Sequence, residues 1–172
     1  MPASYSHAEM TPTERVKNTI FGLPADRTPI YGWVSANLSG PISKAYGSVS
    51  AFEDKYEFDL AHIFGGPGAF KQDVIKKLRA SCEELTPDVL LSTDIFTDPD
   101  NADYYKDIRD SISFHKRRGR FCYVQTPGFF ENFNSIFPIE EQLLYLAEYE
   151  MELGELYSRQ AEWTKKFADR CL

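Results

Sequence analysis

The sequence has no long apolar run, and its first residues, MPASYSHAEM, lack the basic start and the apolar core of a signal peptide. No stretch approaches the roughly 18 apolar residues that a membrane span requires. We therefore expect a soluble, cytoplasmic protein that does not have a membrane as a partner.

Cysteine is scarce, and clustered basic residues are few. Cys82, Cys122 and Cys171 form no Cys-x-x-Cys pair and the three histidines are dispersed, so we expect neither a disulfide framework nor a metal site within the chain. Acidic residues outnumber Lys and Arg by 26 to 19, which gives a net charge of −7. Because phosphate contacts need clustered cations, we expect no nucleic-acid partner.

The chain does contain enough apolar side chains for one core, since 42% of its 172 residues are hydrophobic and 15% are aromatic. Residues 1–10 are small and polar, and we expect them to be flexible. A helix is predicted to begin after Thr11, with Pro12 at its first position and Glu14 completing a capping box. One domain is therefore expected over residues 11–172.

Strand and helix patterns alternate along this domain. Strands are predicted at residues 28–34, 58–66 and 120–126, and helices at residues 70–85, 101–118 and 139–172, the last with a break near residues 148–152. Residues 87–96 fit a short strand or an extended arm. This alternation predicts an α/β fold in which parallel strands are joined by helical crossovers.

Several short motifs each have a functional and a structural interpretation. Gly65–Gly68 suits a phosphate cradle or a tight turn, and it lacks the third glycine of a dinucleotide fingerprint. Asp98–Asp103 resembles part of a calcium loop, but an aspartate holds the required glycine position, which favours helix capping. His115–Arg120 is either an anion-binding patch or a set of cations that offset the negative end of a helix dipole. His62 lies within an apolar strand, either as a hydrogen-bonded core residue or as a substrate contact.

In order along the chain, several stretches resemble the uroporphyrinogen decarboxylase superfamily. MTPTERVKNTIFGLPADRTPI is similar to the family's opening, in which a threonine-capped helix and a glycine precede an Asp-Arg-x-Pro signature, here Asp26, Arg27, Thr28 and Pro29. FDLAHIF resembles the family's second strand, and FTDPDNADYYKDIRDSI its linker and next helix. TPGFFENFNSIFPIEEQLLYLAEYEMELGELYSR resembles the third strand and the long helices after it. The resemblance covers residues 10–172.

The resemblance implies the N-terminal half of a TIM (β/α)8 barrel, with about three parallel strands and their surrounding helices. Three strands leave two open sheet edges, which we expect to be covered by a missing C-terminal half or by a second copy of the chain. The last residues, FADRCL, carry no C-cap, so we expect residues 11–172 to be a partial barrel domain truncated at its C-terminus.

Two activities are known for the superfamily: uroporphyrinogen decarboxylation in porphyrin biosynthesis, which is a lyase reaction, and zinc-dependent methyl transfer between corrinoid proteins and thiols. The decarboxylases bind carboxylates through an arginine-rich segment after the first strand, whereas YGWVSANLSGPISKAYG has no arginine. The resemblance therefore favours the methyltransferase branch. The family's zinc ligands lie in later strands, so zinc and a corrinoid partner are expected only if the missing half is present.

Two alternatives remain open: uroporphyrinogen decarboxylation, and a non-catalytic half-barrel that acts as a dimer or a binding module. Function in a barrel lies at the carboxyl ends of the strands. Glu131 is a candidate catalytic acid at that mouth, or it bonds the backbone of its own segment, and His62 is a deeper catalytic candidate. The residues predicted to bind substrate follow the three strands and are Ser35, Asn37, Gly65, Gly66, Gln125 and Thr126.

Overall fold

The computed structural model describes residues 9–126 and 128–172, except for the side chain of Ala36, and it divides into two compact units. The first unit comprises the chain up to Phe64 together with Ile108–Gln125, and the second comprises Gly65–Asp107 together with Thr126–Leu172. Of the segment expected to be flexible, only residues 9 and 10 are described. The protein is α/β, because helices predominate and a small parallel sheet lies in the first unit.

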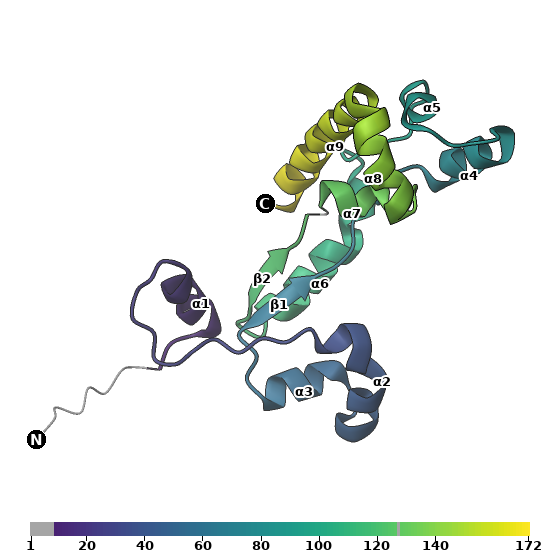
Figure 1. Ribbon diagram of the computed structural model, residues 1–172. Coiled ribbons are helices and arrows are strands. Elements are labelled where there is room, and N and C mark those ends of the chain that lie inside the picture. The colour runs from purple at the N-terminus through teal and green to yellow at the C-terminus, as the bar shows by residue number, and fades with distance from the viewer. Residues whose placement is uncertain (1–8, 127) are drawn as a thin grey trace, which may run out of the picture. The chain divides into compact units, whose positions relative to one another are not determined.

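The sheet of the first unit consists of β1 (Leu60–Ile63) and β2 (Phe121–Val124), which pair in parallel as the alternation of strand and helix predicts (Figure 1). Side chains alternate between the two faces of a strand. In β1, Ala61 and Ile63 are buried in the core of the unit, whereas His62 is only half-buried. The sheet therefore holds His62 on the face opposite the core.

Among the described residues, the helices of the first unit are α1 (Pro12–Ile20), α2 (Val34–Tyr46), α3 (Val49–Lys55) and most of α6 (Lys106–Lys116). The predicted capping box of α1 is confirmed. The Thr11 hydroxyl accepts from the backbone N–H of Glu14 at 3.3 Å, and the Glu14 carboxylate accepts from the backbone N–H of Thr11 at 2.9 Å.

The strand predicted over residues 28–34 is not found, so the sheet has two strands where about three were expected. The segment forms a backbone bond with the residue before β1, from the N–H of Asp59 to the carbonyl of Ile30, and Pro29 has no N–H to extend a ladder. Tyr31 and Trp33 are 38% and 54% exposed. The apolar pattern of this segment therefore arises from exposed aromatic side chains and not from a strand buried on both faces.

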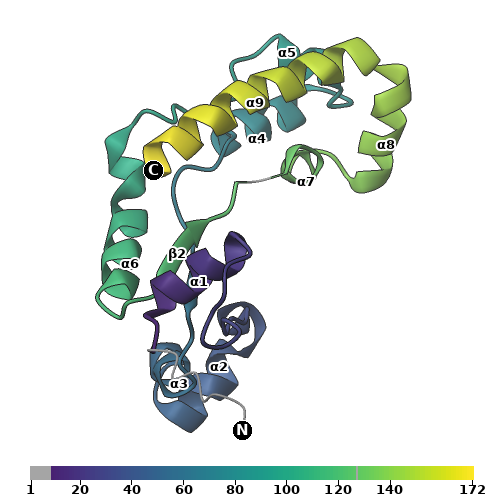
Figure 2. The same ribbon diagram turned by 90° about the vertical axis from the view of Figure 1, so that its left-hand side faces the viewer.

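The second unit is helical in the residues described. Its elements are α4 (Gln72–Ser81), α5 (Pro87–Leu91), the 3-10 helix η1 (Ala102–Tyr105), α7 (Phe129–Phe133), α8 (Ile139–Glu148) and α9 (Glu150–Cys171). Helix α9 packs along α5 (Figure 2). The predicted break in the last helical stretch is confirmed at Tyr149, which separates α8 from α9.

A short strand or an extended arm was expected over residues 87–96, but residues 87–91 form the helix α5. Pro87 occupies the first helical position of α5, where a backbone N–H is not needed. Only the end of the stretch is extended, and there Phe96 forms an isolated antiparallel bridge with Phe70. No helix in the described part of the chain combines the length and the apolar character that a membrane crossing needs.

Candidate functional site

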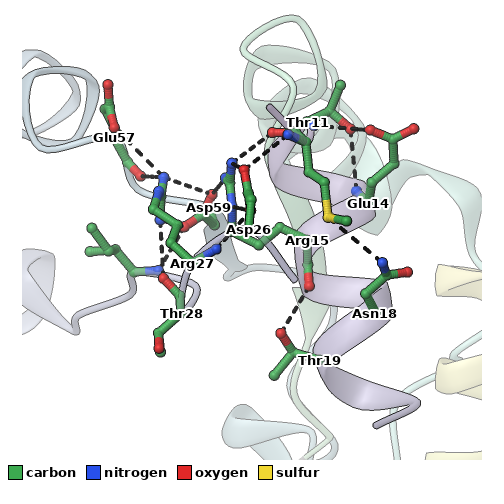
Figure 3. A network of polar contacts seen from close by, with 12 residues as sticks. Thr11, Glu14, Arg15, Asn18, Thr19, Asp26, Arg27, Thr28, Glu57 and Asp59 are labelled. Carbon is green, nitrogen blue, oxygen red and sulfur yellow. Dashed lines mark hydrogen bonds and ion pairs between the residues drawn. The ribbon is translucent and has the colours of Figure 1, made fainter. Parts of the chain in front are cut away.

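The Asp-Arg-x-Pro signature belongs to a network of ion pairs in the first unit (Figure 3). Arg15 of α1 donates to both carboxylate oxygens of Asp26, from Nε at 2.6 Å and from Nη2 at 2.7 Å, and its Nη1 donates to Asp59. Arg27 Nη1 donates to the second oxygen of Asp59 at 2.6 Å. The network therefore connects α1, the signature and the residue that precedes β1.

Asp59 is fully buried, and its carboxylate is saturated with donors. Besides Arg15, it accepts from Nη1 and Nη2 of Arg27 and from the backbone N–H of Ile30 at 2.7 Å. A carboxylate offers about four lone-pair sites. Since these four donors fill them, Asp59 has no site left for a ligand, and the network holds the fold together and does not form a reaction centre.

The guanidinium of Arg15 also sets the ionisation of Asp26. Its two hydrogen bonds, together with the backbone N–H of Met10, hold the pKa of the Asp26 carboxyl well below its usual range. The pair raises the pKa of Arg15 in return. The signature aspartate is therefore charged throughout the neutral pH range.

A cavity of about 230 Å³ lies in the first unit, and it brings together side chains from four segments of the chain. One wall comes from the segment before α2 and the start of that helix, one from α3, one from β1 and one from α6. The polar and aromatic side chains of the lining are Tyr31, Trp33, Ser35, Glu53, His62, Phe64, Ser111 and His115. None of the residues that line it is a lysine or an arginine.

His62 is held as a neutral imidazole in this cavity. The indole Nε1 of Trp33 donates to His62 Nδ1 at 2.6 Å, and the two ring planes are within 3° of each other. A protonated imidazolium has no acceptor nitrogen, so this bond requires the neutral tautomer that carries its proton on Nε2. Burial also lowers the pKa of His62. The ring stacks on Tyr123, its neighbour on β2, with centroids 4.7 Å apart.

His115 is fixed in the same way by a different donor. Nη1 of the buried Arg120 lies 3.1 Å from His115 Nδ1, and because a guanidinium only donates, Nδ1 is the acceptor. The proton of His115 is therefore also on Nε2. Burial, and then the charge of Arg120, lower the pKa of His115.

Arg120 is itself committed to the acidic side chains of α3. Its Nη1 donates to Oε2 of Glu53 at 2.5 Å and its Nη2 to Oδ1 of Asp54 at 2.6 Å. Burial raises the pKa of Glu53, and the charge of Arg120 opposes that rise. The cavity thus presents two neutral imidazoles, one carboxylate whose counter-ion lies behind it, and two serine hydroxyls.

The substrate-binding and catalytic candidates from the sequence fall in both units. Ser35 and His62 line the cavity, whereas Asn37 and Gln125 belong to the same unit but are exposed and do not line it. The second unit contains the remaining candidates, which are Gly65, Gly66, Thr126 and Glu131.

In the second unit, Gly65 and Gly66 have positive φ values of 125° and 84°, which glycine adopts without strain. This geometry fits the tight-turn interpretation of the glycine motif. Thr126 is exposed. Glu131 is exposed in the first turn of α7, with its carboxylate folded back against Gly128.

The sequence did not point to Trp33, Glu53, Ser111 or His115 as a set, since they come from separate elements. His115–Arg120 was interpreted as cations at a helix end, and His115 does lie in the last turn of α6. The buried Arg120 pairs with Glu53 across 67 positions of sequence.

No group of His, Cys, Asp and Glu within the described ranges is arranged to hold a metal ion. Within the Asp98–Asp103 motif, Asp98 accepts from the backbone N–H of Asp100, and Asn101 caps η1 by accepting from the backbone N–H of Asp103. The carboxylate of Asp100 pairs with Arg170. Comparison of the whole chain with protein-family models, with curated proteins and with solved structures gave no significant match. The fold and the cavity define an α/β protein with a small cavity that polar and aromatic side chains line.

Proposed function

We propose that this chain forms the N-terminal βα units of a uroporphyrinogen decarboxylase-type barrel and that the barrel takes part in corrinoid-dependent methyl transfer. Two features support the barrel. The strands β1 and β2 are parallel, and the chain between them is helical over α4, α5 and α6. The signature residues Asp26 and Arg27 are held by Arg15 and Asp59, which gives the motif a structural role at the entry to β1.

The size and charge of the cavity favour methyl transfer over uroporphyrinogen decarboxylation. About 230 Å³ corresponds to about eight water molecules at roughly 30 Å³ each, which suits a small molecule and not a tetrapyrrole. A substrate with many carboxylates needs cations, and the lining contains no lysine or arginine. Helix α2, at the place of the decarboxylases' arginine-rich segment, contains no arginine either.

The described residues do not fit the zinc ion of the methyltransferases, so no step through zinc is assigned to this chain. Its own residues can position a small substrate. His62 and His115 each keep a proton on Nε2 to donate, while Glu53 accepts through the carboxylate oxygen that does not bind Arg120. A corrinoid protein would be the partner of the complete barrel.

The reading frame beyond the codon of Leu172, and the protein that it encodes, provide the test. Further βα units with a His-x-Cys pair are expected. The complete protein should demethylate methylcobalamin in the presence of a thiol, and the change in corrinoid absorbance should report the reaction. Release of CO2 from uroporphyrinogen, or unrelated sequence after an in-frame stop, would contradict the proposal.

A second function is favoured by one observation. In the described part of the chain the sheet has only two strands, so β1 and β2 each have an edge without a neighbouring strand. Such edges recruit further strands. If a second copy covers them, the chain is a non-catalytic half-barrel that dimerises. Light scattering decides this, because a monodisperse monomer excludes the dimer.

A further inference from the structure

We infer that the cavity of the first unit binds a small, neutral, planar aromatic molecule that carries a carbonyl acceptor next to an N–H donor, such as an aromatic carboxamide or lactam. The inference rests on the proposed function insofar as that function treats the cavity as a ligand site. It adds the chemical class of the ligand.

The walls of the cavity provide flat aromatic surfaces that the protein leaves open. Trp33 and Phe64 are 54% and 57% exposed, and their ring centroids are 6.0 Å apart. The imidazole of His62 is parallel to the indole of Trp33 within 3° and to the ring of Tyr123 within 8°. Large aromatic side chains that stay exposed around a cavity favour a ligand that stacks on them.

The polar groups of the cavity are arranged to donate twice and to accept once. Trp33 occupies Nδ1 of His62 and Arg120 occupies Nδ1 of His115, so the ring proton of each imidazole is on Nε2. The hydrogen bonds that His62 and His115 make to Trp33 and Arg120 engage Nδ1 and not Nε2. Glu53 uses Oε2 for Arg120, which leaves Oε1 as an acceptor. A carbonyl beside an N–H matches this set.

The charges around the cavity disfavour an ionised ligand of either sign. An anion would find no lysine or arginine in the lining with which to pair. A cation would meet the two N–H groups of the imidazoles, and Glu53 is already neutralised by Arg120. A neutral ligand avoids both costs, since an unpaired charge in a partly buried site is expensive.

The volume of the cavity suits a ligand with one aromatic ring. A cavity of about 150 Å³ suffices for benzene in a protein interior. About 230 Å³ accommodates one such ring with a substituent of a few atoms, such as an amide.

Benzamide is the probe for the test, and the readout is the fluorescence of Trp33. The chain has two tryptophans, so the full-length variant Trp163→Phe, altered in the second unit, leaves Trp33 as the reporter. Benzamide should quench or shift this emission saturably, with calorimetry on the unmodified chain as an independent measurement. Cyclohexanecarboxamide, which lacks the ring, and N,N-dimethylbenzamide, which lacks the N–H, should each bind at least about tenfold more weakly.

Two variants test the polar contacts. His62→Phe keeps an aromatic ring but removes Nε2–H, and it should weaken benzamide about tenfold, the loss expected for one hydrogen bond. Ser113→Ala, an exposed position on the same helix as the lining Ser111, is the matched control and should leave the affinity unchanged. The probe comparison on the unmodified cavity remains decisive if His62→Phe does not fold.

The outcomes separate this inference from the proposed function. If benzoate or benzylammonium binds more tightly than benzamide, or if cyclohexanecarboxamide binds as tightly, the ligand class is wrong although the cavity remains a ligand site. If none of the probes binds, both the ligand class and the role of the cavity are overturned. The methylcobalamin assay of the complete protein contains no benzamide, so it tests methyl transfer independently of the ligand class.

Discussion

Removing the charge of Asp59 should destabilise the first unit far more than removing the charge of its exposed neighbour Glu57. Both side chains face Arg27, but Asp59 is fully buried, whereas the Glu57 side chain is 75% exposed and lies 3.7 Å from Arg27 Nη2. Asp59→Asn and Glu57→Gln each keep the size of the side chain and remove one negative charge. The two substitutions therefore separate burial from charge.

The expected cost of Asp59→Asn follows from the positions of its four donors. One carboxylate oxygen accepts from Arg15 and from Nη2 of Arg27, and the other accepts from Nη1 of Arg27 and from the N–H of Ile30. Either orientation of an asparagine amide turns its NH2 toward two of these donors. Breaking a buried ion pair by changing one partner costs about 3–5 kcal/mol, and Asp26 still compensates Arg15, so we expect about 3 kcal/mol.

A loss of about 3 kcal/mol changes the folding equilibrium by more than roughly a hundredfold, against a typical total stability of about 5–15 kcal/mol. Urea titration followed by Trp33 fluorescence in the Trp163→Phe background reports on the first unit. With a slope of about 1–3 kcal/mol per molar urea, the midpoint should fall by roughly 1–3 M. Glu57→Gln should cost less than about 1 kcal/mol, as exposed pairs do.

Equal losses in the free energy of unfolding of the two variants would refute the structural role of the network. If Asp59→Asn and Glu57→Gln differ by less than about 0.5 kcal/mol, the four donors do not depend on the carboxylate as the geometry requires. Near-ultraviolet circular dichroism of each variant provides the control that the folded state itself is retained.

Three further predictions concern the first unit. Burial lowers the pKa of His62 and of His115, so the unfolded chain binds protons before the folded chain as the pH falls below about 6.5. The free energy of unfolding, from urea titrations at each pH, should therefore decrease from pH 7 toward pH 5, and less steeply in His62→Phe. The same dependence on pH in both proteins would contradict this. Thr11→Ala removes the N-cap of α1 and should cost about 1 kcal/mol in the same titration, whereas Thr11→Ser should cost much less. Gly119→Ala should lower the free energy of unfolding by about 1 kcal/mol, because φ at Gly119 is 74°. Steric contact adds nothing to this cost, since the nearest atom to an added Cβ, on Pro12, is 3.7 Å away. An unchanged midpoint of thermal unfolding would exclude the left-handed conformation.

Local signals in the sequence determined where several elements begin and end. The capping box at Thr11, the positions of β1 and β2, and the break between α8 and α9 were all predicted, and each depends on residues close together in the chain. Such features are predictable because the hydrogen bonds and the periodicity that produce them span only a few positions.

Tertiary structure alone decided that residues 28–34 do not form a strand, and it decided which side chains line the cavity. The aromatic pattern of Tyr31 and Trp33 is the same for a buried strand and for an exposed wall, and only the packing distinguishes the two. Arg120 meets Glu53 and fixes the tautomer of His115 across contacts that no local pattern encodes. The sequence by itself therefore determined the cap of α1, the break between α8 and α9 and the positions of β1 and β2, whereas the protonation and the partners of the cavity side chains depend on which distant residues the fold brings within hydrogen-bonding distance.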